Sequence, residues 1–138
     1  MKRLVLAATL LLVSFASSGA EPTPDSISSQ FFDGLVKGDS EKAIDGLFGL
    51  NPLFKDKRQQ IQLVKTQLAG AIQIYGPASA AELVLKEDLS PSLQRRVYIT
   101  KHDLHPLSWE MYFYKAKSGW LPDQLLFVDQ YQVLGSKK

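Results

Sequence analysis

Cysteine is absent from this chain of 138 residues. Without it no disulfide can stabilise the fold, so the domain has to be held together by a hydrophobic core. A bacterial lipoprotein anchor, which needs a cysteine, is excluded as well. The chain also lacks an apolar run long enough for a membrane span, because the run at residues 4–15 falls short of the roughly 20 residues that a spanning helix needs.

An excess of charge of one sign is also missing. The chain has 16 Lys and Arg residues against 14 Asp and Glu residues, and Lys2 and Arg3 precede the first acid. The chain beyond these two is therefore formally neutral. Nucleic-acid binding needs clustered basic residues, so no nucleic-acid partner is predicted.

The N-terminal segment has the pattern of a signal peptide. Lys2 and Arg3 precede the apolar run, and small residues at Ser18 and Ala20 allow cleavage before Glu21. A membrane anchor or a buried helix is the alternative. We expect a signal peptide at 1–20, a flexible leader at 21–26, a single domain at 27–134 and a tail at 135–138. The mature protein would be periplasmic or secreted, with no membrane span.

Helical periodicity dominates the first half of the mature chain. A first helix is predicted from Ile27 until Gly38 ends it, with Asp25 or Ser26 as its cap. A short second helix follows, with Ala43, Ile44, Leu47 and Phe48 as its apolar stripe. A third, long helix is predicted to start after the cap Asn51, with Pro52 at its first position, and to end before Gly76.

Beyond Gly76-Pro77 the apolar period changes to two, which indicates half-buried strands. The segments "LSPS", "KHDLHP" and "AKSG" divide this part into four strands joined by short turns. Helices followed by an antiparallel meander predict an α+β fold, with three helices packed on a curved four-stranded sheet.

The last hairpin contains most of the aromatic residues, and its register determines which of them face the helices. A loop of Ser118-Gly119 alone would pair Phe113 with Gln124, whereas a loop of Lys117-Ser118-Gly119 would pair Phe113 with Asp123 and Met111 with Leu125. We predict the longer loop, with Gly119 in the left-handed conformation and a bulge. The inward side chains are then Val97, Ile99, Trp109, Met111, Phe113, Leu125 and Phe127, and the outward ones are Tyr98, Tyr112, Tyr114 and Leu126.

The element order, together with "QLAGAIQIYGPASAAEL" and "SLQRRVYITKHDLHPLSWEMYFYKAKSGW", resembles small secreted bacterial members of the nuclear transport factor two-like superfamily, the cystatin-like α+β roll. The resemblance covers essentially all of the mature chain. It implies a strongly curved sheet wrapped around the long helix, with a cone-shaped pocket. The superfamily includes isomerases, dehydratases, epoxide hydrolases, transport adaptors and uncharacterised exported domains, so the fold alone does not define an activity.

Two kinds of site residue are predicted for this cone. The expected ligand pocket consists of Phe31, Ile72, Val97, Trp109, Met111, Phe113, Leu125 and Phe127, although the same apolar pattern is typical of a plain core. For catalysis, the titratable candidates are Asp33, Asp123 and Tyr75. No catalytic motif of the superfamily aligns with this chain. His102, Asp103 and His105 lack a fourth ligand at recognisable spacing, so neither a metal nor a cofactor is predicted.

The leading functional hypothesis is a non-catalytic exported domain that holds a small apolar ligand in the cone or serves as a protein-interaction module. The alternative is an isomerase, dehydratase or hydrolase that uses an acid in the pocket. A structural or inhibitory partner of another envelope protein is a third class. Tyr98, Tyr112 and Tyr114 on the convex face suggest a homodimer interface, because tyrosine combines apolar area with a polar tip; single tyrosines on a solvated sheet are the other interpretation.

Overall fold

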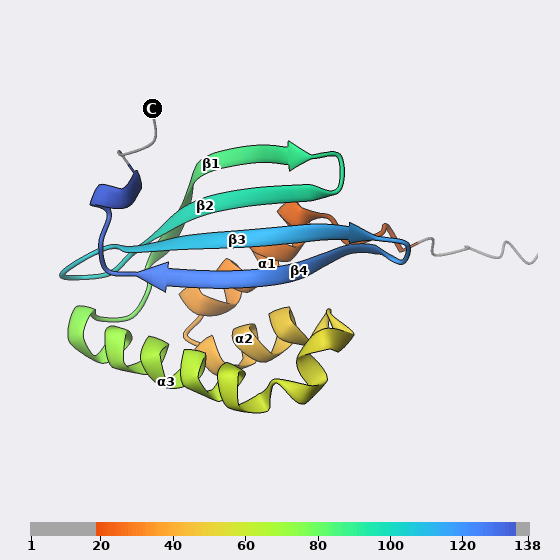
Figure 1. The fold of residues 1–138 in the computed structure, drawn as a ribbon. Coiled ribbons are helices and arrows are strands. Elements are labelled where there is room, and N and C mark those ends of the chain that lie inside the picture. Colours follow the sequence, from red (N-terminus) through yellow and green to blue (C-terminus); the bar gives the residue numbers. More distant parts are fainter. Residues whose placement is uncertain (1–18, 135–138) are drawn as a thin grey trace, which may run out of the picture.

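The computed structural model describes residues 19–134 and shows three α-helices packed against a four-stranded antiparallel sheet, as predicted (Figure 1). Most of the predicted signal peptide and the predicted tail lie outside the described residues. The elements are α1 (Pro24–Val36), α2 (Ser40–Gly49), the 3-10 helix η1 (Pro52–Asp56), α3 (Arg58–Tyr75), β1 (Ala80–Ser90), β2 (Leu93–Lys101), β3 (Leu107–Ala116), β4 (Gly119–Val128) and the 3-10 helix η2 (Gln132–Leu134).

Helix α1 begins earlier than its apolar periodicity indicates. Thr23, and not Asp25 or Ser26, is the N-cap, and its hydroxyl accepts a hydrogen bond from the backbone N–H of Ser26. Pro24 occupies the first helical position, where its missing N–H costs nothing. The last three residues of the predicted leader are therefore helical. The end of the helix is as predicted, since Gly38 follows with a φ of 87°.

The predicted third helix is interrupted. Asn51 caps η1 instead of the long helix, and α3 starts only at Arg58, after Lys57 leaves helical geometry at φ −108° and ψ 35°. The interruption turns Phe54 onto Phe48, with the ring centroids 4.6 Å apart. The apolar period alone could not reveal the break, because η1 and α3 continue the same pattern.

The sheet is a meander in which each strand pairs with its neighbour in sequence, in the order β1-β2-β3-β4. Helices α1, α2 and α3 lie on one face of it, which we call the inner face (Figure 1). Among residues 19–134, no α-helix lies over the opposite face, which we call the outer face. The cone shape that the resemblance implies stays a prediction.

The predicted facing of β2 is wrong by one residue. Tyr98 lies opposite Trp109, and Val97 lies opposite Glu110, so Tyr98 faces inward while Val97 and Ile99 face outward. The Tyr98 ring packs on Phe32 of α1 at 4.4 Å between centroids. Both faces of β2 carry apolar or aromatic side chains, so alternation alone could not distinguish them.

The β3–β4 hairpin confirms one predicted pair and corrects another. Met111 pairs with Leu125 as expected, but Phe113 pairs with Pro122, because the loop has two residues, Lys117 and Ser118, and the bulge lies at Asp123. Gly119 has the expected positive φ, at 121°. A bulge beside Pro122 has a physical reason: proline cannot donate to a strand ladder and is tolerated at bulges and on edge strands.

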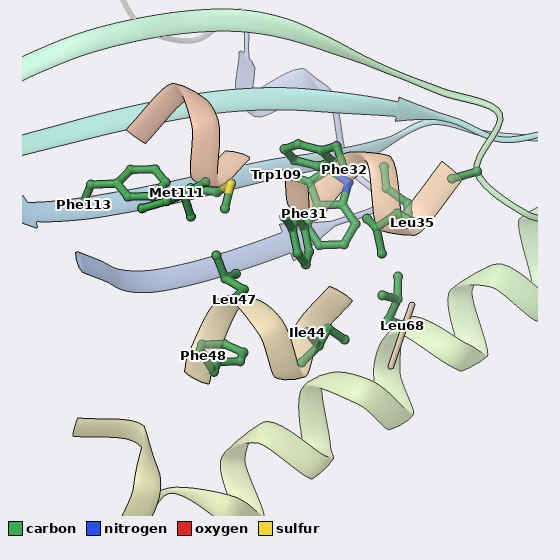
Figure 2. Close-up of a cluster of buried hydrophobic side chains, with 13 residues drawn as sticks. Phe31, Phe32, Leu35, Ile44, Leu47, Phe48, Leu68, Trp109, Met111 and Phe113 are labelled. Carbon is green, nitrogen blue, oxygen red and sulfur yellow. The ribbon is translucent and has the colours of Figure 1, made fainter. Parts of the chain in front are cut away.

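The core lies between α1, α2, α3 and the inner face. Trp109 and Phe113 are 0% exposed, and Phe31 and Phe32 of α1 both meet the Trp109 ring edge-on. Figure 2 shows these rings beside Met111, with Ile44, Leu47 and Phe48 of α2 and Leu68 of α3 around them. The helices and the sheet thus share one continuous hydrophobic cluster.

Candidate functional site

A groove of about 550 Å³ runs between α1 and α2. The two helices are joined by a short turn at Lys37–Asp39, so they form a helical hairpin. Apolar residues form the floor of the groove, and polar residues form its rim. The floor includes Ile27, Phe31, Ala43 and Leu47, and the rim includes Ser26, Ser29, Gln30, Asp33, Lys37, Asp39 and Lys42.

Small residues make this groove possible. The helices approach closely at Gly34, where a Cβ atom would lie 2.8 Å from the Cβ of Ala43. Gly46, one turn beyond Ala43, lines the groove, and a Cβ there would meet nothing within 4 Å. The hollow therefore exists in part because Gly46 has no side chain. Sequence reasoning missed this site, and the signal for it was Gly34, Ala43 and Gly46 at helical spacing in two adjacent helices.

The groove has two different ends. The turn end carries charges of both signs, from Asp33, Lys37, Asp39 and Lys42. The far end lies between Ser26 and Ile27 of α1 on one side and Leu47 of α2 and its C-cap Leu50 on the other, and it has no charged residue in its lining. Eleven residues of α1 separate these ends, which corresponds to about 16 Å of helix. The groove is thus elongated and becomes less charged toward its far end.

The residues predicted to line a ligand pocket are found mainly in the core. Phe31, Trp109, Met111 and Phe113 are buried within the hydrophobic cluster, and Ile72, Leu125 and Phe127 pack against it. Val97 is the exception and the correction, since it lies on the outer face. Of the predicted pocket residues, only Phe31 also lines the groove between α1 and α2.

The three catalytic candidates do not form one site. Asp33 is exposed on the rim of the groove, while Asp123 is the bulge residue of β4. Tyr75, the last residue of α3, donates its hydroxyl to Oδ2 of Asp129 at 2.7 Å. This hydrogen bond raises the pKa of Tyr75. Tyr75 therefore secures the segment after β4 to the end of α3.

The two histidines form hydrogen bonds with nearby backbone and side-chain groups. His102 Nδ1 lies 2.7 Å from the carbonyl oxygen of Gly76, and its Nε2 lies 2.8 Å from the Thr100 hydroxyl. His105 Nε2 lies 2.6 Å from the carbonyl oxygen of Asp129, and its ring packs on Tyr75. Within residues 19–134, no group of three His, Asp or Glu side chains is arranged to hold a metal ion.

A charged cluster lies on the outer face, across β1, β2 and β3. The guanidinium of Arg95 binds both carboxylate oxygens of Glu110, at 3.0 and 2.9 Å, and reaches Glu87 at 3.1 Å. Tyr112 donates its hydroxyl to the same Glu110. The pKa of Arg95 is raised, mainly by Glu110, and burial together with Glu110 raises the pKa of Tyr112. The cluster is thus a set of mutually satisfied charges on β1, β2 and β3.

Apolar side chains surround this cluster, and the predicted interface tyrosines divide between the two faces. Leu126 is 55% exposed and lies opposite Glu110, while Leu85 and Val128 are exposed on the same face. Tyr112 and Tyr114 are on the outer face as predicted. Tyr98 is not, because it packs into the core against Phe32.

Among the described residues, no helix is both long and apolar enough to cross a membrane. No protein-family model, no curated protein and no solved structure matches this chain.

Proposed function

We propose that this chain is a non-catalytic binding domain that takes an elongated, mostly apolar small molecule between α1 and α2. The observation that carries the proposal is the groove itself, with its volume of about 550 Å³, its floor of Ile27, Phe31 and Leu47, and its polar rim. Small-molecule sites are typically hollows of about 300–1,000 Å³ with apolar walls and a few polar groups. The ligand site is thus proposed for the groove rather than for the cone.

The separation of the titratable candidates favours binding over an isomerase, dehydratase or hydrolase activity. General acid-base catalysis needs a titratable group within hydrogen-bond reach of the reacting atoms. Tyr75 is engaged with Asp129, Asp123 lies on β4, and of these candidates only Asp33 lines the groove. The two carboxylates on the rim, Asp33 and Asp39, are exposed, and exposed carboxylates support recognition of a ligand better than chemistry on it.

A steric plug tests this proposal. Gly46→Leu places a side chain in the groove, at a position where an added Cβ atom meets nothing within 4 Å. We expect the parent protein to bind the fluorescent apolar probe phenylnaphthylamine and the variant to bind it much more weakly. Gly70→Leu is the matched control, since Gly70 is also an open helical position but lies on α3, away from this groove. Equal binding by the parent and Gly46→Leu would contradict the proposal.

Native mass spectrometry of protein purified from its own compartment is the complementary measurement. A retained small molecule in the parent protein, absent from Gly46→Leu, is the expected result. Retention of the same molecule by both proteins would place it elsewhere in the fold.

We also propose that the outer face pairs with a second copy of the chain. Four strands about 4.8 Å apart and about ten residues long at ~3.3 Å each give a face of roughly 600 Å². Two such faces bury ~1,200 Å², the lower limit for a stable protein interface. Arg95 and Lys101 each pair with glutamates of the same face. A second copy would therefore meet charges that are already neutralised, between exposed Leu85, Leu126 and Val128.

Sedimentation of the mature protein tests the homodimer. Leu126→Lys is expected to produce a folded monomer, and Leu63→Lys is the control, because Leu63 is similarly exposed but lies on α3. A parent protein that sediments as a monomer at tens of micromolar would remove this proposal.

Export is the remaining part of the proposed function. The charged start, the apolar run and the small residues before Glu21 support cleavage after Ala20. N-terminal sequencing of the mature protein should begin at Glu21. A secreted or periplasmic form that begins at Met1 would favour the membrane anchor instead.

A further inference from the structure

The first turn of α1 has two sides with different contacts. Ser26 and Ile27 line the far end of the groove. Asp25, the residue before them, binds the sheet: its Oδ2 accepts a hydrogen bond from Lys86 Nζ at 2.7 Å, and its Oδ1 accepts one from Arg96 Nε at 3.2 Å. This wall of the groove is therefore attached by an ion pair to β1 and β2.

Arg96 is a fixed anchor for that attachment. Its side chain is 2% exposed on the inner face, opposite Met111. Its Nη2 donates to Oε1 of Gln94 at 2.8 Å, and its Nη1 donates to the carbonyl oxygen of Arg95 at 3.4 Å. A buried guanidinium held in this way has little conformational freedom. Its hydrogen bond to Asp25 therefore fixes the start of α1 relative to the sheet.

Helix α2 holds α1 at a different place. The close approach of the two helices is at Gly34 and Ala43, near the turn. At the far end, the groove itself lies between α1 and residues 47–50, which are the end of α2 and its C-cap. The distance between the two walls there depends on how α1 is fixed to the sheet, through Ile27 and Phe31 in the core and through Asp25 at the start of the helix.

We infer that Asp25, Lys86 and Arg96 form a clamp that sets the width of the far end of the groove, which makes Asp25 a positioning residue for ligands that extend to that end. This inference rests on the proposed function. It also names the ligand class: a linear molecule with an apolar chain long enough to reach from the charged turn end to the far end. A short molecule whose polar head is held at the charged turn end does not reach the far end, so its binding does not depend on the clamp.

The dependence of affinity on the length of a bound alcohol separates the clamp from a general loss of stability, which would weaken the binding of long and short alcohols alike. Displacement of phenylnaphthylamine by decanol and by hexanol is measured for the parent and for Asp25→Asn, which removes the charge and keeps the size. The variant should bind decanol several-fold more weakly and hexanol with unchanged affinity. Asp25→Glu, which restores the carboxylate, should recover decanol binding in part.

Glu41→Gln is the charge control, because Glu41 is an acid in the first turn of α2 that lies outside the groove lining. If Asp25→Asn does not fold, Lys86→Met is the second variant. It removes the hydrogen bond between β1 and Asp25 and leaves the one between Arg96 and Asp25 in place. An equal loss of affinity for both alcohols, or no loss for either, would overturn the clamp.

The two proposals fail in different ways. The proposed function fails, and the clamp with it, if the parent protein binds neither alcohol. It also fails if the Gly46→Leu variant binds both alcohols as well as the parent does. A parent protein whose binding is blocked by Gly46→Leu but unchanged by Asp25→Asn leaves the proposed function in place and removes only the clamp.

Discussion

The indole N–H of Trp109 donates a hydrogen bond to the hydroxyl oxygen of Thr100 at 2.9 Å, and both side chains are 0% exposed. The Thr100 hydroxyl also lies 2.8 Å from His102 Nε2. Because His102 Nδ1 faces the carbonyl oxygen of Gly76, that nitrogen carries a proton and donates it. In the neutral ring Nε2 then accepts from Thr100. The largest residue of the core is thus connected through Thr100 to the end of α3.

Replacement of Thr100 by Val should destabilise the domain by about 1–3 kcal/mol, because it leaves the buried indole N–H of Trp109 without a partner. Thr100→Ser keeps the hydroxyl and should cost clearly less. Urea denaturation of the two variants measures the difference. Equal free energies of unfolding would mean that the hydrogen bond does not contribute to stability.

Replacement of Phe113 by Ala should cost about 3–5 kcal/mol, as expected for a large-to-small change in a packed core. Tyr114→Ala is the control on the adjacent position, since Tyr114 is about half exposed on the outer face. Its effect on the free energy of unfolding should be much smaller. Similar losses for both variants would contradict the assigned facing of β3.

Two glycines in the helical hairpin should respond in opposite directions to the same substitution. Gly34→Ala should destabilise, because the new methyl group would lie too close to the Cβ of Ala43. Gly46→Ala should stabilise by roughly 0.5–1 kcal/mol, because alanine is the better helix former and the position is open. Thermal melting of both variants against the parent decides this, and a lower melting temperature for Gly46→Ala would count against it.

The ion pair of Asp25 should make the free energy of unfolding depend on pH in the acid range. Its hydrogen bond with Lys86 is the main cause of the lowered pKa of Asp25, and Arg96 lowers it further. A carboxyl whose pKa is lower in the folded state stabilises the protein above its unfolded pKa, near pH ~4, and this contribution is lost as the pH falls through the folded value. Asp25→Asn lacks the contribution at every pH.

The measurement is the difference in free energy of unfolding between the parent and Asp25→Asn. This difference should favour the parent at about pH 6 and shrink toward zero in acid. A difference that stays constant from neutral pH into acid would show that the carboxylate charge is not what stabilises the helix start.

The amino-acid pattern was sufficient for the fold class, the order of the elements and the burial of Trp109, Met111 and Phe113. It failed where two patterns overlap. On β2, Tyr98 and Val97 are both acceptable inward residues, and the choice depended on tertiary contacts: Phe32 receives the Tyr98 ring, and Asp25 receives Arg96. The alternation of apolar and polar residues along a strand does not show which face meets the helices, because it describes one strand at a time.

The groove was missed for a related reason. Its floor residues Ile27 and Leu47 belong to the stripes that identify helices α1 and α2, and Phe31 was expected to line the cone rather than a groove between two helices. The hollow above them depends on what is missing from Gly46 and on how close Gly34 brings the helices. Such a distance between two helices is a property of their packing and not of either sequence segment.

The neighbour-to-neighbour order of the sheet has a consequence for the folding pathway. Every strand pair closes through a loop of a few residues, so the sheet forms through local contacts, which favours fast folding. Docking of α1 is different, because Asp25 and Arg96 are 71 positions apart along the chain. Bringing them together has the higher cost in chain entropy. We therefore expect α1 to dock after the hairpins have formed, so that Asp25→Asn should speed unfolding more than it slows folding.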